Sequence, residues 1–203
     1  MDVGGSHADA VTMKREAQSQ YAVVGLHHAG TAGDRGKWPR WAKTRDGVEY
    51  RIRPIRPDDL ERDRSFINNL SASSRYNRMM GLMREPSAEL LDHFVHVDYR
   101  REMALVAVVG EGADESIIAV ARYGGNTSHC EFAIVVADEW QSRGIGTTLS
   151  QLLFAYAKTH GVRRMYAVLL ADNARMLKLA DDLHMDVRRS ADDNTVVEAW
   201  HSL

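Results

Sequence analysis

The chain has 203 residues, of which 44% are hydrophobic and 27% are charged, proportions typical of a soluble globular protein. Its net charge of −2 at pH 7 does not favour nucleic acid as a dominant partner, so we expect no nucleic-acid partner. The longest apolar stretch near the N-terminus, Tyr21–Leu26, is too short for a signal peptide or a membrane span. A single cysteine, Cys130, excludes an internal disulfide and a cysteine-rich zinc site. We therefore expect a cytoplasmic protein with no membrane partner.

Residues 1–46 differ from the rest of the chain. They are rich in small and polar residues and show no sustained hydrophobic period, which predicts a flexible or weakly structured N-terminal extension. Short helical or turn segments are expected at Met13–Gln20 and Trp38–Ala42. His27 and His28 lack a third ligand at a suitable spacing, so we expect no metal site.

From residue 47 onward the pattern predicts alternating strands and helices. Tyr50–Ile55 alternates as a half-buried strand does, and Pro57 followed by two acidic residues indicates a helix start. A second helix is predicted to begin at Pro86. Three strands should follow, separated by glycine-containing turns: Met103–Val109, Ile117–Ala121 and Cys130–Val136.

The last part of the chain continues this alternation. Apolar residues recur at i, i+4, i+7, i+8 and i+11 from Ile145, which predicts a helix over Thr147–Lys158 that ends at His160 and Gly161. The remaining elements are a strand at Met165–Leu170, a helix at Asn173–Leu183, and closing strands at Val187 and Val196–Val197. The order β-α-α-β-β-β-α-β-α-β predicts an α/β (α+β) fold with a meander and a crossover helix.

The segment Gln141-Ser142-Arg143-Gly144-Ile145-Gly146 lies between the third meander strand and the following helix. Backbone N–H groups at a helix start have no partner within the helix, and the helix dipole adds positive charge there. Glycine allows the backbone to approach a ligand closely. The segment therefore predicts a site for a phosphate or a pyrophosphate.

Dinucleotide-binding folds also use G-x-G after a strand. In those folds the glycines follow the first strand of a βαβ unit, and an acidic residue about 20 positions downstream binds the ribose. Here the loop follows a meander late in the chain, which argues against that fold.

This loop matches the Q/R-x-x-G-x-G/A pattern of the GNAT superfamily of N-acetyltransferases, which the chain resembles over residues 47–203. Asn173–Leu179 is similar to the family segment in which an asparagine opens the last large helix. The resemblance implies a mixed, mostly antiparallel central sheet flanked by helices. A narrower resemblance, carried by Asp98–Ala107 and Cys130–Ile134, is to the acetyltransferase domain of Pat-type protein lysine acetyltransferases.

The resemblance implies acetyl-CoA as the acyl donor and no metal. The pyrophosphate would contact the loop, and the pantetheine arm would pair with the strand before it. Asn173 would bond the pantetheine arm, serve as a helix cap, or both. An N–H group, that of Val135, would polarise the thioester carbonyl. The implied donor-binding residues are Ile134, Val135, Val136, Gln141, Arg143, Gly144, Ile145, Gly146, Thr147 and Asn173.

Glu131 is the candidate general base, the role that this position has in the Pat-type pattern. A lysine amine has an ordinary pKa of about 10.4 and arrives protonated, so a base is useful. Strand alternation places Glu131 on the face opposite Phe132, and burial among apolar neighbours would raise its pKa. The alternative is an ion pair with an arginine across the sheet. Asp138 and Glu139 are further candidate acids, whereas Cys130 is expected to be buried and inert.

The chain departs from the family pattern at Ala180. Many members carry a tyrosine there, seven residues after the asparagine, that protonates the leaving thiolate. The acceptor is expected to contact the segment Asn68–Arg84. Three functions stay open: acetylation of a protein lysine, acetylation of a small amine or amino acid, and acyl-CoA sensing without catalysis. The chain is expected to be a monomer or a homodimer.

Overall fold

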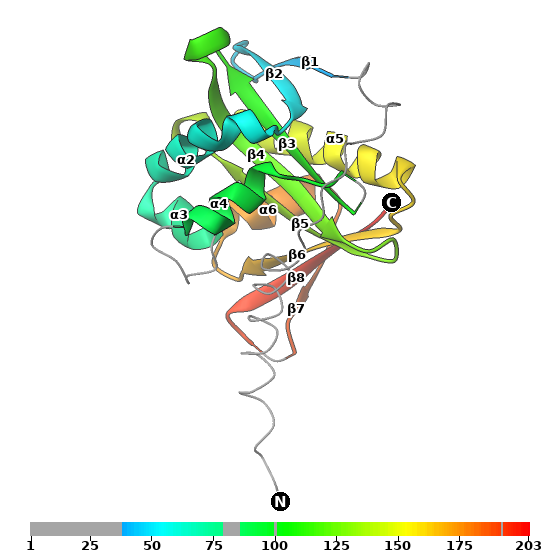
Figure 1. The fold of residues 1–203 in the computed structure, drawn as a ribbon. Helices are drawn as coiled ribbons and strands as arrows, with labels where there is room; N and C mark the ends of the chain where they lie inside the picture. The colour runs from blue at the N-terminus through cyan, green and yellow to red at the C-terminus, as the bar shows by residue number, and fades with distance from the viewer. Residues whose placement is uncertain (1–37, 79–85, 100, 192) are drawn as a thin grey trace, which may run out of the picture.

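The structure is a computed structural model that describes residues 38–78, 86–99, 101–191 and 193–203. These residues form one eight-stranded sheet in the order β1-β2-β3-β4-β5-β6-β8-β7 (Figure 1). All neighbouring strands are antiparallel except β5 and β6, which are parallel and joined through a helix. The strands are β1 (Arg40–Lys43), β2 (Glu49–Pro54), β3 (Glu102–Val109), β4 (Ser116–Gly125), β5 (Cys130–Val136), β6 (Arg164–Leu170), β7 (Asp186–Arg189) and β8 (Val196–Ser202).

Helices cover both faces of the sheet, as Figure 1 shows. They are α2 (Leu60–Asn69), α3 (Ala72–Arg78), α4 (Ala88–Val95), α5 (Ile145–Thr159) and α6 (Ala174–Asp182). One core contains buried side chains of α5, including Leu149 and Leu153, packed on the sheet. The other lies between the opposite face and helices α2 and α4, and contains Phe66, Phe94 and Val106. The expected mixed, mostly antiparallel sheet flanked by helices is confirmed.

The prediction for the N-terminal part is corrected where the structure describes it. Trp38–Ala42 was expected to form a helical or turn segment, but Arg40–Lys43 is strand β1 and pairs antiparallel with β2. The extension therefore cannot reach to residue 46 as an unstructured segment. Four residues carry too little periodicity to predict a strand, because their order depends on pairing with β2 rather than on local propensity. Residues 1–37, which include Met13–Gln20, His27 and His28, lie outside the described residues.

The remaining differences are small. Helix α3 lies in the segment that was expected only to line the acceptor groove, and its polar sequence Ala72–Arg78 carries no apolar stripe from which to predict it. Its only buried residue is Ser74. The two closing strands form a hairpin, with β8 inserted between β6 and β7. Among the helices described, the longest is α5 with 15 residues, and none has the length and apolar character needed to span a bilayer.

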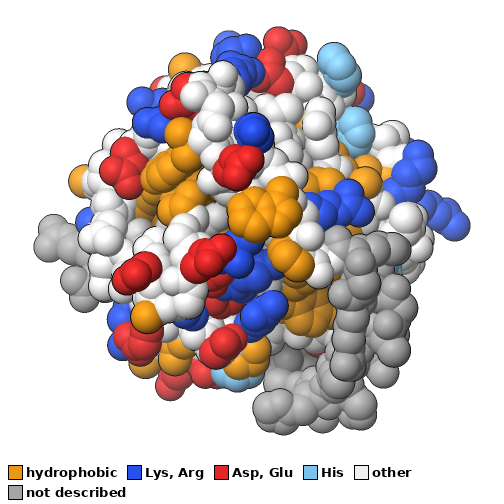
Figure 2. Space-filling view, turned by 90° about the horizontal axis from the view of Figure 1, so that it is seen from above, with side chains coloured by type: hydrophobic (Ala, Val, Ile, Leu, Met, Phe, Trp, Pro, Cys, Tyr) orange, Lys and Arg blue, Asp and Glu red, His pale blue; other side chains and the backbone are white. Residues whose placement is uncertain are grey.

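Buried charges fix the start of α2 against the sheet. Arg53 on β2 donates two hydrogen bonds to Asp59, at 2.6 and 2.7 Å, and a third to Glu115 at 2.5 Å. Burial alone would raise the pKa of Asp59, but the hydrogen bonds and charge of Arg53 hold it below its ordinary value. Figure 2 shows acidic and basic side chains interspersed over this end of the molecule. These bonds hold the helical layer in register with β2 and β4.

Candidate active site

The two central strands separate at the site. The β5–β6 ladder contains only two pairs, Cys130 with Met165 and Glu131 with Tyr166. On its other side β5 stays paired with β4 up to Val136. Beyond Glu131, one edge of β5 therefore has no ladder partner among the described strands. Such an edge can pair with an extended ligand, as an added strand would.

The glycine loop leads directly from this edge into α5. Gly144 is the N-cap residue and has a φ of +90°, a conformation that L-residues rarely adopt. The first α-helical bond of this turn runs from the Thr148 N–H to the Gly144 carbonyl at 3.1 Å. A Cβ at Gly146 would lie 3.8 Å from side-chain atoms of Ile134 and Val136. The first turn of α5 thus lies close to the side chains of β5, and its backbone N–H groups are at a helix start, the position expected for an anion site.

Two polar side chains tie the loop to neighbouring elements. The Gln141 side-chain amide donates to the Val136 carbonyl at 2.9 Å and to the Ser74 hydroxyl at 3.1 Å. Asp138 accepts from the Ser71 N–H at 2.8 Å and from the hydroxyls of Ser71 and Ser74 at 2.7 Å. Burial opposes the effect, but these bonds lower the pKa of Asp138, which makes it a poor base. Gln141 therefore positions the loop through its amide nitrogen.

The hairpin between β1 and β2 also contacts this loop. The Arg45 N–H donates to the Arg143 carbonyl at 3.0 Å. The Arg143 guanidinium pairs with Asp46 at 3.1 Å and lies 5.1 Å from the centre of the Trp140 ring. A Cβ at Gly144 would lie 3.6 Å from the Cγ and Nε atoms of Arg45. The sequence provided no signal for these contacts, since at least 97 positions separate the residues of the hairpin turn from the loop residues that they touch.

Glu131 lies on the face of the sheet that carries α2–α4. Its neighbours on the opposite face, Cys130 and Phe132, are buried in the α5 core, so the expected alternation is confirmed. Burial raises the pKa of Glu131, and the charge of Arg78 at the end of α3 partly opposes this effect. No ion pair within 4 Å joins Glu131 to a described arginine or lysine. A half-buried carboxylate with a raised pKa has the properties of a general base near neutral pH.

Glu131 belongs to a row of residues that crosses the sheet. The strand registers pair Glu102 with Gly124, Gly124 with Glu131, Glu131 with Tyr166, and Tyr166 with Trp200. Directly paired residues project to the same face. The Tyr166 and Trp200 rings stack with centroids 4.8 Å apart. The row therefore places one carboxylate on each side of Gly124. The stacked rings of Tyr166 and Trp200 lie on the other side of Glu131.

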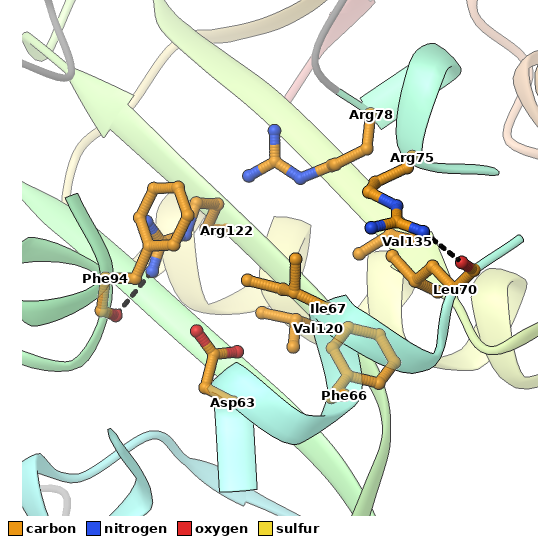
Figure 3. Close-up of a pocket in the computed structure, with 10 residues that line it drawn as sticks. All are labelled: Asp63, Phe66, Ile67, Leu70, Arg75, Arg78, Phe94, Val120, Arg122 and Val135. Atoms are coloured by element: carbon orange, nitrogen blue, oxygen red, sulfur yellow. Dashed lines mark hydrogen bonds between the residues drawn. The ribbon is translucent and has the colours of Figure 1, made fainter. Parts of the chain in front are cut away.

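A small cavity lies further along the same face (Figure 3). Its volume is about 20 Å³, room for about one water molecule. Three arginines and the Asp63 carboxylate surround it, and Figure 3 shows Asp63 pointing into it from α2. Burial raises the pKa of Asp63 to about 6, against the charges of Arg122 and Arg78. The lining residues are Asp63, Phe66, Ile67, Leu70, Arg75, Arg78, Phe94, Val120, Arg122 and Val135.

The structure also describes the other residues singled out in the sequence, Cys130, Asn173 and Ala180. The Cys130 thiol donates to the Asn126 carbonyl at 3.1 Å, and burial raises its pKa to about 11, so it is not a nucleophile. The Asn173 side chain accepts from the Met176 N–H at 3.2 Å and caps α6. Ala180 is buried in the core, so the missing tyrosine leaves no hydroxyl at this position. Among the residues that the structure describes, no three His, Cys, Asp or Glu side chains are grouped to hold a metal.

Comparisons with known proteins agree with this geometry. The family model described as the Acetyltransferase (GNAT) family matches residues 76–185. An acetyltransferase of Pseudomonas aeruginosa is 38% identical over 154 residues, which cover 75% of this chain and 83% of that protein. The acetyltransferase Pat of Mycolicibacterium smegmatis is 36% identical over 144 residues, 70% of this chain, but the match spans only 42% of Pat. The crystal structure of the GNAT domain of S. lividans PAT superposes with a TM-score of 0.76 at 30% identity, covering 82% of this chain and 98% of that one.

Proposed function

The chain belongs to the GNAT acetyltransferase family and is an N-acetyltransferase, and we propose that it transfers the acetyl group of acetyl-CoA directly to the side-chain amine of a protein lysine. Glu131 is the general base in this proposal. The observation that carries it is the position of Glu131, which forms the last β5–β6 pair and therefore lies where the strands part. This position is next to the edge on which an extended thioester would lie.

The donor would bind along the loop and the free edge of β5. Backbone N–H groups of Gly144, Ile145, Gly146 and Thr147 would hold the pyrophosphate, with Gln141 fixing the loop. The pantetheine arm would pair with the free-edge backbone groups of Ile134 and Val136, whereas those of Val135 face β4. Asn173 uses its side-chain oxygen to cap α6, which leaves its amide hydrogens for the arm.

The reaction would proceed by direct attack. The Glu131 carboxylate accepts a proton from the lysine ammonium, and the neutral nitrogen attacks the thioester carbonyl carbon. An N–H on the free edge of β5, that of Ile134, stabilises the negative charge that develops on the carbonyl oxygen. The expected Val135 N–H is not suited to this role, because alternation from the Ala137 N–H bond to the Ile118 carbonyl directs it toward β4. The carbon–sulfur bond then breaks, and the nitrogen releases its second proton to water. The thiolate takes a proton from water in turn, because Ala180 offers no hydroxyl.

The row across the sheet supports a cationic acceptor on a long aliphatic arm. Glu102 and Glu131 flank Gly124, whose missing side chain leaves space between them. Burial raises the pKa of Glu102 as well, against the charge of His93. Two strand spacings separate the α-carbons of the two glutamates, about 10 Å, so an ammonium between them is within reach of both carboxylates. Tyr166 and Trp200 would pack against the methylene groups of a lysine.

A small-molecule acceptor is less well supported. The described cavity on this face has room for only about one water, so it does not enclose an amino acid. A protein substrate needs no enclosed pocket, since only its lysine side chain has to enter the site. We also propose that the catalytic domain spans residues 47–203, extended by the β1 hairpin, and that it works in the cytoplasm as a monomer or a homodimer without a metal.

The test is acetyl transfer from acetyl-CoA to lysine-containing peptides and proteins. Glu131→Gln should lower kcat/KM at pH 7 by at least about 100-fold while the Kd for acetyl-CoA stays within about twofold. Glu139→Gln, which removes an exposed carboxylate two residues before the loop, is the matched control and should keep its rate. A rate that is unchanged in Glu131→Gln would remove Glu131 from the base role. Transfer to free amino acids but not to peptides would overturn the protein acceptor.

A further inference from the structure

The β1–β2 hairpin is built to hold its turn against the glycine loop. The Thr44 carbonyl accepts from the Gly47 N–H at 3.0 Å, and its hydroxyl accepts from the Val48 N–H at 2.9 Å. Thr44 itself is buried, so the turn is well defined. The backbone bond from Arg45 to the Arg143 carbonyl then joins this turn to the loop. The side chain of Arg45 therefore has a fixed origin next to the start of α5.

The two arginines at the loop differ in their charge partners. Arg143, the residue within the loop, has its guanidinium paired with Asp46. Arg45 has no ion pair or side-chain hydrogen bond with any described residue, and it is exposed. Its Cγ and Nε atoms lie on the side of Gly144 that a Cβ would occupy. Of the two arginines, only Arg45 of the hairpin has a guanidinium without a carboxylate partner among the described residues.

We propose that Arg45 binds the diphosphate of acetyl-CoA and supplies side-chain charge to the donor site. This inference rests on the proposed binding of the diphosphate at the Gly144–Thr147 turn. A guanidinium can form two charge-assisted hydrogen bonds to phosphate oxygens, which complement the backbone N–H groups of the helix start. Gly144 is the N-cap, so a side chain lying against it is adjacent to the N–H groups that would hold the phosphates.

A solvated surface arginine is the ordinary alternative, and its position argues against it. Arg45 approaches Gly144, which is almost 100 positions away, so closely that a Cβ there would lie 3.6 Å from its Cγ and Nε atoms. Asp46, by contrast, pairs with the guanidinium of Arg143 at 3.1 Å. The turn thus carries two opposite charges. The Asp46 carboxylate pairs with Arg143 of the loop, and the Arg45 guanidinium is available to a ligand.

The test compares Arg45→Gln with Arg40→Gln in the full chain. Each variant is titrated with three acetyl thioesters in the absence of an acceptor. Arg40 begins strand β1, at the opposite end of this arm of the hairpin from Arg45, and packs over Trp38, so it controls for the loss of a hairpin charge. The donors are acetyl-CoA, its analogue without the 3′-phosphate, and S-acetylpantetheine, which has no diphosphate. The Arg45 backbone bond is kept in the variant, so the hairpin should stay docked.

We expect Arg45→Gln to raise the Kd for acetyl-CoA about tenfold, to raise that for the 3′-dephospho analogue by the same factor, and to leave S-acetylpantetheine unchanged. Arg40→Gln should bind all three donors as the wild type does. Wild-type affinity of Arg45→Gln for acetyl-CoA, or an equal loss for S-acetylpantetheine, would overturn the inference. A loss confined to the donor with the 3′-phosphate would overturn the assignment to the diphosphate. If the wild type itself binds acetyl-CoA no better than S-acetylpantetheine, the proposed loop site fails instead.

Discussion

Glu131 pairs with Tyr166 in the last rung of the β5–β6 ladder, so one backbone pair both ends the parallel pairing and fixes the carboxylate. The α-carbon of Glu131 cannot move away from the point of strand separation without breaking that pair. Burial at this position raises the pKa of the carboxyl. The same position therefore sets both the location of the candidate base and its basicity.

The pH dependence of the reaction should respond to Arg78. A general base acts as the carboxylate, so kcat/KM should fall as the pH drops through the raised pKa of Glu131. The charge of Arg78 lowers that pKa. Arg78→Gln removes this effect and should move the acidic limb of the kcat/KM profile to higher pH. Arg75→Gln, a change on the same helix at a residue that does not influence Glu131, should leave the limb in place; an equal movement in both variants would contradict the assignment.

Filling the space at Gly124 should impair the reaction with the acceptor lysine and leave acetyl-CoA binding unchanged. A Cβ there would meet only the Glu102 Cβ, at 3.9 Å, and the residue has no positive φ, so Gly124→Val should fold. The added methyl groups would lie between the two carboxylates. We expect kcat/KM for a lysine peptide to fall at least about tenfold with an unchanged Kd for acetyl-CoA. Steady-state kinetics with the peptide varied would detect this, and an unaltered peptide dependence would exclude an acceptor path over Gly124.

The two loop glycines should respond differently to alanine. Gly144→Ala places a side chain at a φ of +90°, 3.6 Å from Arg45, and should cost about 1–2 kcal/mol of unfolding free energy as well as donor affinity. Gly146→Ala lies within α5, where alanine favours the helix, and its Cβ would make ordinary contacts at 3.8 Å. Urea denaturation of both variants checks the contrast. Equal destabilisation would show that the backbone conformation at Gly144 is not what requires glycine.

Asp63 should lower stability at neutral pH. Its Oδ2 atom is buried without a hydrogen-bond partner among the described residues, and its pKa is raised to about 6. The protonated carboxyl favours the folded state at low pH, and this contribution is lost as the pH rises through about 6. Asp63→Asn should therefore raise the unfolding free energy by about 1–3 kcal/mol at pH 8.

Denaturation at two pH values separates this effect from a change in packing. The gain in Asp63→Asn should largely disappear below pH 5, where the wild-type carboxyl also becomes neutral in the folded state. A gain of the same size at pH 4.5 and pH 8 would show that the charge of Asp63 is not the cause.

The sequence carried enough information to predict the order of the long elements and the donor loop. Apolar periodicity from Ile145 and the position of the glycines after a meander are local signals, and both elements are where they were expected. The alternation around Glu131 likewise predicted the correct face of the sheet. These features depend on residues close together in the chain, which a single sequence displays directly.

Features that depend on distant pairing could not be predicted. Strand β1 is ordered by β2, and Arg45 meets Gly144 only because the hairpin turns back over α5. The row from Glu102 to Trp200 depends on the register of four strand pairs, and no local sequence pattern predicts that register. Helix α3 is held by the Asp138 carboxylate, which accepts from Ser74 within the helix and from Ser71 just before it, rather than by an apolar stripe.

Strand β1 also determines where the chain can be shortened for expression. A fragment starting at residue 47, the boundary that composition suggests, would uncover the edge of β2, which carries the buried residues Tyr50 and Ile52. An unprotected edge next to a core invites pairing between molecules and aggregation. It would also remove Arg45 and Asp46 from the glycine loop. A fragment that starts at Trp38 keeps the edge covered, so we expect it to stay monodisperse where the shorter one precipitates.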